Sequence, residues 1–347
     1  MFEEMAKNPT SWLSGSGEES MVVLSSRVRL ARNVMDCTYP SAADPGTRAR
    51  VISYFESAFK HSSKMTNGRF LKADDLTSLD KDFLVERHLM SPAFMQEDGS
   101  RALYISEDEQ VSIMVNEEDH LRIQALTPGL GPTKAFTVAS EFDNEIGKYL
   151  QYDYDSDFGF LTACPTNVGT GMRASVLIHL PGLVITKDIE RMISRISKMG
   201  VVVRGFYGEG TDVLGNLFQI SNQTTLGVSE KEILELISGV TRSIIDDEAK
   251  ARERLLEEAS DQIADKIWRA YGILKYARVL TSEEVMNLLS AVRLGVAIGL
   301  IDFVDISLIN EILLLSQPAH LQKYYAKEMN IDGRDFVRAE MVREKLK

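Results

Sequence analysis

Residues 164–175 combine residue types that serve phosphate chemistry. A cysteine, Cys164, precedes a Pro-Thr-Asn turn, the two glycines Gly169 and Gly171, and an arginine, Arg173, nine residues after the thiol. Glycines allow a ligand to approach main-chain N–H groups, and a guanidinium can hold a phosphate through two hydrogen bonds. The segment predicts a thiol beside a phosphate site. The alternative is a glycine-rich turn with a structural cysteine, because isolated cysteines usually behave as small hydrophobes.

Two arginines near the start of the chain have the spacing of one strand face. In residues 25–32, Arg27 and Arg29 alternate with Val28 and Leu30. An extended chain places the arginines on one face and the apolar residues on the other. Two guanidinium groups without an acidic neighbour predict an anion site. The alternative is a solvated basic strand.

Two further segments carry carboxylates beside arginines. Residues 116–122 read Asn-Glu-Glu-Asp-His-Leu-Arg and follow an apolar, β-rich run, and residues 203–209 read Val-Arg-Gly-Phe-Tyr-Gly-Glu. Consecutive acids after a strand are commonly a solvated loop or a helix start, with ion pairs and turn hydrogen bonds as their default roles. The acids alone therefore leave the chemistry open.

The sequence of residues 164–170, Cys-Pro-Thr-Asn-Val-Gly-Thr, resembles the active-site signature of the phosphagen (guanidino) kinases. The resemblance implies that Glu118 and Glu209 are catalytic carboxylates that clamp a guanidinium, and that Cys164 acts there as a thiolate that positions the substrate. It implies ATP as the phosphoryl donor, with Mg²⁺ carried by the nucleotide and no metal site made by protein ligands. Five arginines would hold the phosphates, namely Arg27, Arg29, Arg122, Arg173 and Arg204.

The same resemblance implies the nucleotide-binding segments. His88 would lie near the adenine or ribose, although a packing role is equally open. The implied segments contain Ser26, Arg27, Val28, Arg29 and Leu30; Arg173, Ala174, Ser175, Val176 and Leu177; and Arg204, Gly205, Phe206, Tyr207, Gly208 and Glu209. Phe206 and Tyr207 replace more polar residues of the metabolic enzymes, so the small-substrate specificity of those enzymes does not transfer.

The order of the segments is similar to that of the bacterial protein-arginine kinases. Arg27 comes early, without the helical domain that precedes it in creatine and arginine kinases, and a long helical region follows the catalytic motifs. This resemblance implies ATP-dependent phosphorylation of arginine side chains in proteins, which marks them for a Clp unfoldase-protease and inactivates a heat-shock transcriptional repressor. It also implies an activator protein. The alternative is a kinase of free arginine or another small guanidine.

Residues 334–339, Arg-Asp-Phe-Val-Arg-Ala, form a second candidate site. Arg334 and Arg338 are four residues apart, so on a helix they share a face with Asp335 beside them. Such a pair can bind a phosphate, and the resemblance implies an allosteric phosphoarginine pocket at Arg334, Asp335 and Arg338. The alternative is the charged end of an amphipathic helix.

The elements that must position these residues change in character at Ser229. Before it, short β-rich runs at 22–24, 103–106, 111–115, 175–180, 201–206 and 217–220 alternate with helical patterns, one of which covers 185–199. After it, capping boxes at Ser229 and Thr281 introduce helical patterns that continue to the end. We expect an α+β protein with a phosphagen-kinase and glutamine-synthetase-like catalytic domain at 1–228, built on a mixed or antiparallel sheet with packed helices. Residues 1–20 would be a loose lead-in, and 229–347 an all-helical dimerisation and regulatory domain.

Composition narrows the functional class. The 347 residues carry a net charge of −12, which argues against a nucleic-acid surface. No apolar run is long enough for a membrane span. Two cysteines argue against a disulfide framework and fit a cytoplasmic protein, and two cysteines with five histidines give no zinc-ligand spacing. We expect a cytoplasmic homodimer.

Overall fold

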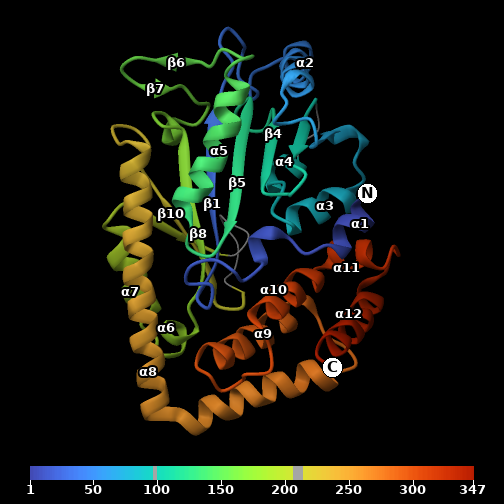
Figure 1. Ribbon diagram of the computed structural model, residues 1–347, viewed down its shortest axis with the longest axis vertical. Helices are drawn as coiled ribbons and strands as arrows, with labels where there is room; N and C mark the ends of the chain where they lie inside the picture. Colours follow the sequence, from blue (N-terminus) through green and yellow to red (C-terminus); the bar gives the residue numbers. More distant parts are fainter. Residues whose placement is uncertain (97–99, 206–213) are drawn as a thin grey trace.

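One antiparallel sheet organises the catalytic half of the chain (Figure 1). The computed structural model describes residues 1–96, 100–205 and 214–347. Within these residues eight strands form one sheet in the order β2-β3-β4-β5-β1-β8-β10-β9, and the small hairpin β6-β7 stands apart. The strands are β1 (Val23–Arg32), β2 (Arg69–Lys72), β3 (Ala102–Ile105), β4 (Val111–Val115), β5 (Leu121–Pro128), β6 (Tyr154–Asp155), β7 (Gly159–Phe160), β8 (Met172–His179), β9 (Val201–Arg204) and β10 (Leu217–Asn222). Of the two expected sheet types, the antiparallel one is present.

Helices cover the sheet and form the C-terminal half. The α-helices are α1 (Phe2–Lys7), α2 (Pro45–His61), α3 (Ser78–Glu86), α4 (Pro92–Gln96), α5 (Pro132–Ile146), α6 (Pro181–Ile185), α7 (Ile189–Ser197), α8 (Glu230–Tyr276), α9 (Ser282–Ala297), α10 (Ile306–Leu315), α11 (Pro318–Tyr324) and α12 (Ile331–Lys345). Short 3₁₀ turns are η1 (Ser11–Leu13), η2 (Ala73–Asp75) and η3 (Pro165–Asn167). None of the helices in these described ranges is both long and apolar enough to cross a membrane.

Apolar and polar side chains alternate along the central strands, so the sheet has one apolar face and one largely polar face. Val28, Leu30 and Val176 belong to the main hydrophobic core, to which α5 and the first part of α8 also contribute. Leu24, Leu126 and their neighbours at one end of the opposite face pack into the core of the C-terminal helices. At the other side of the sheet, Leu103, Ile105 and Met114 of the opposite face pack into a third core with α3. The polar part of that face lies between these two apolar regions.

The long helix α8 links the two cores. Its N-cap Ser229 forms the complete capping box, whereas Thr281 before α9 makes only the bond to the Glu284 N–H. The helix is kinked at Ala259, whose φ and ψ are −146° and 34°. The buried apolar residues before the kink join the sheet core, and those after it join the helical core. The change from mixed to helical sequence patterns at Ser229 thus marks the start of α8. The helix passes from the sheet core to the helical core at its kink, which is visible in Figure 1.

The first 20 residues are not the loose lead-in that we expected. Met5 and Trp12 are buried, and α1 packs beside α11 at the other end of the sequence. The Trp12 ring lies 4.8 Å from the ring of His88. Met5 and Trp12 belong to two different apolar cores, so the segment is held against the fold at two places.

Candidate active site

Neighbouring strands bring arginines together on the polar face of the sheet. Arg29 on β1 lies opposite Arg173 on β8 and, on its other side, opposite Gln124 on β5. Arg27 lies one pleat away on the same face. Directly opposed side chains of antiparallel strands share a face. The register therefore brings together arginines that are more than a hundred residues apart in the sequence.

These side chains line a cavity of about 590 Å³. One wall comes from the end of α3 and the start of α4, including Val85 and Ser91, and another from the loop that contains Cys164. The cavity is lined by eight of the residues predicted from the sequence, namely Arg27, Arg29, His88, Glu118, Arg122, Cys164, Arg173 and Arg204.

The cavity concentrates positive charge. Burial, and then the neighbouring Arg122 and Arg173, lower the pKa of Arg27 to about 10. Burial, and then the charges of Arg27, Arg122 and Arg173, hold the pKa of Arg29 well below its usual value. Arg27 donates to Gln219 Oε1 at 2.8 Å, and Arg29 Nε has no hydrogen-bond partner among the described residues. An anion in the cavity would stabilise the charged form of each guanidinium.

The three consecutive acids after β4 have separate roles. Glu117 is buried and accepts from Arg122 Nη1 at 2.7 Å. The Glu118 side chain is 42% exposed, lies 3.7 Å from Arg122 Nη2 and lines the cavity. Glu118 is therefore the acid of this motif that is accessible to a guanidinium in the cavity.

Asp119 and His120 hold the loop in place. Asp119 Oδ1 accepts from Asn33 Nδ2 at 2.7 Å and from the Ala163 N–H at 2.6 Å. His120 Nδ1 accepts from the Val34 N–H at 3.0 Å, and its Nε2 lies 3.0 Å from the Thr38 carbonyl oxygen. These are the turn hydrogen bonds expected as the default for this motif.

The Cys164 loop presents its thiol to the cavity. Cys164 precedes the 3₁₀ turn η3, and its Sγ lies 3.1 Å from Thr166 Oγ1. The Thr225 hydroxyl lies 2.8 Å from the carbonyl oxygens of both Thr166 and Val168, which fixes the turn from β10's side of the sheet. The cysteine is half-buried, so the alternative of a fully buried structural cysteine does not describe it.

The glycines of this loop serve chain packing. Gly169 has a φ of +109°, and a Cβ there would lie 2.3 Å from the Thr225 carbonyl oxygen. Gly171 has a φ of +62°, and its Cβ would lie 2.6 Å from the Ala31 carbonyl oxygen. The Gly169 N–H donates to Phe160 across a bridge to β7. We expected both glycines to admit a ligand; at Gly169 that explanation is wrong, because protein backbone occupies the space. Gly171 does line the cavity.

His88 both lines the cavity and packs against the N-terminal segment. Its backbone is left-handed, with a φ of 61°, and its carbonyl oxygen accepts from Gln124 Nε2 at 2.5 Å. Burial, and then the charge of Arg27, lower the pKa of His88 to about 3. The ring is therefore neutral at physiological pH, in the part of the cavity walled by Val85 and the start of α4.

Several predicted nucleotide-binding residues do not direct their side chains into the cavity. Val28, Leu30, Ala174 and Val176 alternate to the opposite face and lie in the sheet core. Ser26 bonds to Gly129 and Gly131, Leu177 packs into the helical core, and Ser175 Oγ contacts the Arg27 carbonyl oxygen at 3.4 Å. Gly205 is buried at the end of β9. Phe206, Tyr207, Gly208 and Glu209 lie outside the described residues.

The cavity also includes residues to which the sequence analysis assigned no individual role. Gln124, Gln219 and Gln223 line it, as do Thr166 and Asn167. Gln124 follows Arg122 by two residues on the same strand, so a period-two extension of the arginine pattern would have found it. Gln219 depends on the pairing of β10 with β8 and β9, which gives no local signal.

The C-terminal motif lies on α12. Arg338 is buried; its Nε donates to the Ser316 carbonyl oxygen at 2.6 Å, and its Nη1 donates to the Leu280 carbonyl oxygen at 2.8 Å and to Asp335. Arg334 Nη1 donates to the Met329 carbonyl oxygen at 3.1 Å. Arg338 thus ties α12 to the end of α10, a structural role that the expected phosphate fork did not include.

The lining of the cavity suits a nucleotide phosphate chain, which could accept from Arg29 Nε, an atom without a hydrogen-bond partner among the described residues. Among the described residues, no group of three or more His, Cys, Asp or Glu side chains could hold a metal ion.

Comparisons with known proteins agree with this geometry. Residues 50–251 match the family model "ATP:guanido phosphotransferase, C-terminal catalytic domain", and residues 260–347 match "Protein-arginine kinase McsB C-terminal domain". A protein-arginine kinase from Geobacillus sp. (strain WCH70) is 46% identical over 97% of this chain and 94% of its own length. One from Symbiobacterium thermophilum is 45% identical over 99% and 98%.

Solved structures share the fold. A duplicated taurocyamine kinase from Schistosoma mansoni, with bound transition-state-analogue components, superposes with a TM-score of 0.62 at 25% identity. That match covers 72% of this chain and 36% of the kinase. A lombricine kinase gives a TM-score of 0.60 at 24% identity, covering 72% and 73%. The cavity is cationic, the fold is that of the phosphagen kinases, and the relatives that match nearly the whole chain are protein-arginine kinases. The chain therefore belongs to the ATP:guanido phosphotransferase family and, within it, to the protein-arginine kinases.

Proposed function

We propose that this enzyme transfers the γ-phosphoryl group of ATP to arginine side chains of proteins. The observation that carries the proposal is one cavity that contains five arginines, the accessible carboxylate of Glu118 and the thiol of Cys164. The names of the relatives, which match the chain over nearly its full length, supply the protein-arginine substrate.

The arginines of the sheet face bind and orient the phosphates. Phosphoryl transfer depends mainly on positioning and on neutralising charge, and preorganised cations supply both. Arg27, Arg29 and Arg173 come from rigid strands, so little reorganisation is needed when an anion enters. Mg²⁺ accompanies the nucleotide and adds further neutralisation of the phosphate charge.

Glu118 acts on the acceptor. A guanidinium is a poor nucleophile because its lone pairs are delocalised and it keeps its proton at physiological pH. A carboxylate can hold the planar group through two hydrogen bonds and accept a proton as the new P–N bond forms. Glu209 is the proposed second carboxylate, and Cys164 positions the guanidinium without a covalent intermediate.

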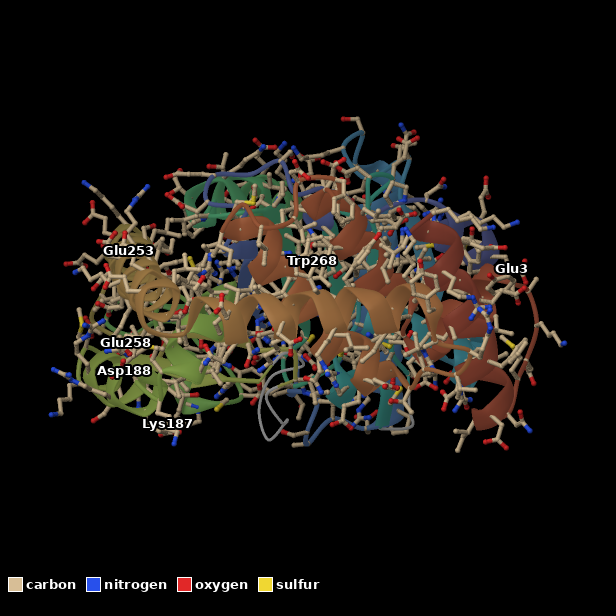
Figure 2. All side chains as sticks on the ribbon, turned by 90° about the horizontal axis from the view of Figure 1, so that it is seen from below. Glu3, Lys187, Asp188, Glu253, Glu258 and Trp268 are labelled. Carbon is tan, nitrogen blue, oxygen red and sulfur yellow. The ribbon has the colours of Figure 1, made fainter. Side chains whose placement is uncertain are left out.

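The resemblance to the protein-arginine kinases supports a proposal for the cellular role. The proposed role includes marking proteins for a Clp unfoldase-protease and inactivating a heat-shock transcriptional repressor in the cytoplasm, with an activator protein as partner. Arg334, Asp335 and Arg338 would form an allosteric phosphoarginine site. Homodimerisation would use the helical half, where Trp268, labelled in Figure 2, is 44% exposed. Its ring stacks on the ring of the exposed Phe303.

The test is the chemical nature of the product. The enzyme is incubated with Mg-ATP and either an unfolded protein or free arginine, and products are read by mass spectrometry at neutral pH. A P–N phosphate is lost in mild acid and kept in base, so we expect acid-labile phosphate on protein arginines and little on free arginine. Acid-stable phosphoserine would contradict the proposal, and preference for free arginine would favour a small-molecule guanidino kinase. The Glu118→Gln enzyme is the matched control.

A further inference from the structure

A second groove of about 590 Å³ lies between α7 and α8 and shares no lining residue with the active-site cavity. Its floor contains the buried side chains of Leu183, Met192 and Ala251. Its walls are mostly cationic, with Arg191, Arg195, Lys198, Lys250 and Arg254 against the carboxylates Asp188 and Asp247. We call this feature the α7–α8 groove (Figure 2, where Asp188 and Glu253 are labelled near it).

Two ion pairs hold the walls together. Arg195 pairs with Asp247, and Arg254 pairs with Asp188 at 2.5 Å. The pairs run in opposite order along the two helices, so α7 and α8 are antiparallel here. Both wall carboxylates are thereby neutralised.

Three of the five cations in the walls are not part of these two ion pairs. Arg191, Lys198 and Lys250 are exposed, and within the described parts of the chain they make no ion pair. Five cations less two carboxylates give the lining a charge of +3, in a chain whose net charge is −12. A concave surface that is positive on a negative protein focuses its field on anionic ligands.

The spacing of the cations fits an extended polypeptide. Arg191, Arg195 and Lys198 lie at i, i+4 and i+7 on α7, and Lys250 and Arg254 lie at i and i+4 on α8. Residues four apart on a helix are separated by about 6 Å along its axis. Alternate side chains of an extended chain are about 6.6 Å apart. An acidic chain in the groove would therefore run along both rows of cations, and Arg191, Lys198 and Lys250 are the cations that need not first give up a carboxylate of the groove.

We propose that the α7–α8 groove is a docking site for an acidic, extended segment of a partner protein. An acidic ligand follows from charge complementarity with the positive lining. An extended segment fits the space between the cations of α7 and those of α8, above the apolar floor. The site also connects to the catalytic face: α7 packs against β9, which contributes Val202 and Arg204 to the active-site cavity. A partner held there lies against the helix that precedes a phosphate-binding strand. This proposal does not rest on the kinase assignment.

The test measures binding directly, without ATP. A fluorescent peptide of alternating Glu and Ala residues is titrated with the full-length protein and followed by anisotropy. Arg191→Glu/Lys250→Glu reverses two unpaired groove cations and is expected to weaken binding by about tenfold or more. The matched control, Lys231→Glu/Lys266→Glu, makes the same charge change on exposed parts of α8 that do not line the groove and should bind like wild type.

Three outcomes would overturn the proposal. The first is equal peptide binding by the groove and control variants. The second is binding of a single-stranded oligonucleotide of equal charge as tight as that of the peptide, which would make the groove a general polyanion surface. The third is a change of oligomeric state in the groove variant without peptide, measured by sedimentation, because the occupant would then be a second copy. If the Glu variant does not fold, Arg191→Gln/Lys250→Gln replaces it.

Discussion

Asp119 accepts a hydrogen bond from the Ala163 N–H at 2.6 Å, and this contact joins the loop of Glu118 to the loop of Cys164. The same carboxylate oxygen accepts from Asn33 Nδ2 at 2.7 Å, which anchors both loops to the end of β1. Asp119 itself does not line the cavity. The position of the thiol relative to the carboxylate therefore depends on a buried acid whose pKa is raised by its burial.

Asp119→Ala should separate these two loops. We expect kcat to fall by about 10- to 100-fold, because a buried hydrogen bond to a charged group contributes about 1.5–3 kcal/mol. ATP affinity should change little, since the arginines lie on the strands. Steady-state kinetics and the alkylation rate of Cys164 are the measurements, and Asp119→Asn, which keeps an acceptor oxygen, should recover part of the activity. Unchanged kinetics and alkylation in Asp119→Ala would show that the loops hold their positions independently.

Glu118→Gln should lower kcat by roughly 10²–10⁴-fold, because the variant loses the proton acceptor and half of the carboxylate clamp. Binding of ATP should persist. Glu117→Gln is the matched comparison: Glu117 orients Arg122, so its loss should weaken ATP binding more than it slows the chemical step. The resemblance predicts the same kcat loss for Glu209→Gln. Activity of Glu118→Gln within a few-fold of wild type would remove Glu118 from the mechanism.

The common face of Arg27 and Arg29 could be predicted from the sequence because it depends on a short-range pattern. Arg27 and Arg29 alternate on one strand, and the period of two fixes their common face whatever the strand pairs with. The antiparallel pairing that sets Arg29 against Arg173, by contrast, joins segments more than a hundred residues apart. Gln219 reaches the cavity through the pairing of β10 with β8 and β9, and the end of α3 reaches it through tertiary packing. Neither contact has a local sequence signal.

Local patterns also failed where tertiary contacts intervened. The helical pattern at 185–199 is divided into α6 and α7, with Lys187 left-handed at a φ of 62°. Pro181 begins α6, and the buried Glu248 accepts from the N–H groups of Gly182 and Leu183, so α6 is fixed by a residue on α8. Leu183 of α6 and Met192 and Ile196 of α7 lie in the sheet core, whereas Ile185 at the end of α6 packs against the helical core.

Thiol alkylation should inactivate the enzyme through Cys164. Cys164 lines the cavity beside the cationic face, whereas Cys37 packs against the sheet core. We expect Cys164→Ala to be impaired, and nucleotide plus substrate to protect the wild type from alkylation. Peptide mapping after alkylation, with Cys37→Ser as control, is the measurement. Modification of Cys37 alone with full activity would contradict the assigned role of the thiol.

Glu86 should make the contact between the two halves of the protein pH-dependent. At the end of α3, its carboxylate accepts from the Ala319 and His320 N–H groups of α11 at 2.8 and 2.7 Å. Burial raises its pKa from 4.5 to about 7. Between these values the native state binds the proton more tightly than the unfolded state, so the contribution of Glu86 to the free energy of unfolding is largest below about pH 4.5 and is lost as pH rises through 7.

Glu86→Gln removes this titration while keeping one acceptor oxygen. We expect the stability of the Gln variant relative to wild type to rise between pH 5 and pH 8, by at most about 3 kcal/mol. Urea unfolding of both proteins at several pH values gives the difference and cancels the titration of other groups. A pH-independent difference would mean that the pKa of Glu86 is not raised in the folded protein.

Alanine variants of Arg334 and Arg338 should differ in their effects on phosphoarginine affinity and on Tm. Arg338 uses Nε and Nη1 for the Ser316 and Leu280 carbonyl oxygens and for Asp335, so only its Nη2 lacks a hydrogen bond among the described residues. Arg338→Ala should therefore lower Tm as well as phosphoarginine affinity. Arg334 makes one bond to the Met329 carbonyl oxygen, and Arg334→Ala should lower affinity about 10- to 100-fold with little change in Tm.

Calorimetric titration of phosphoarginine distinguishes this site from the active-site cavity when Glu118→Gln is titrated in parallel, because that variant keeps α12 intact. We expect Glu118→Gln to retain the binding that Arg334→Ala loses. Full affinity in both arginine variants would reduce the motif to a structural tie between α12 and α10. Loss of affinity in Arg334→Ala with unchanged ATP binding would establish a separate regulatory site, because Arg334 lies on a helix that contributes no residue to the cavity.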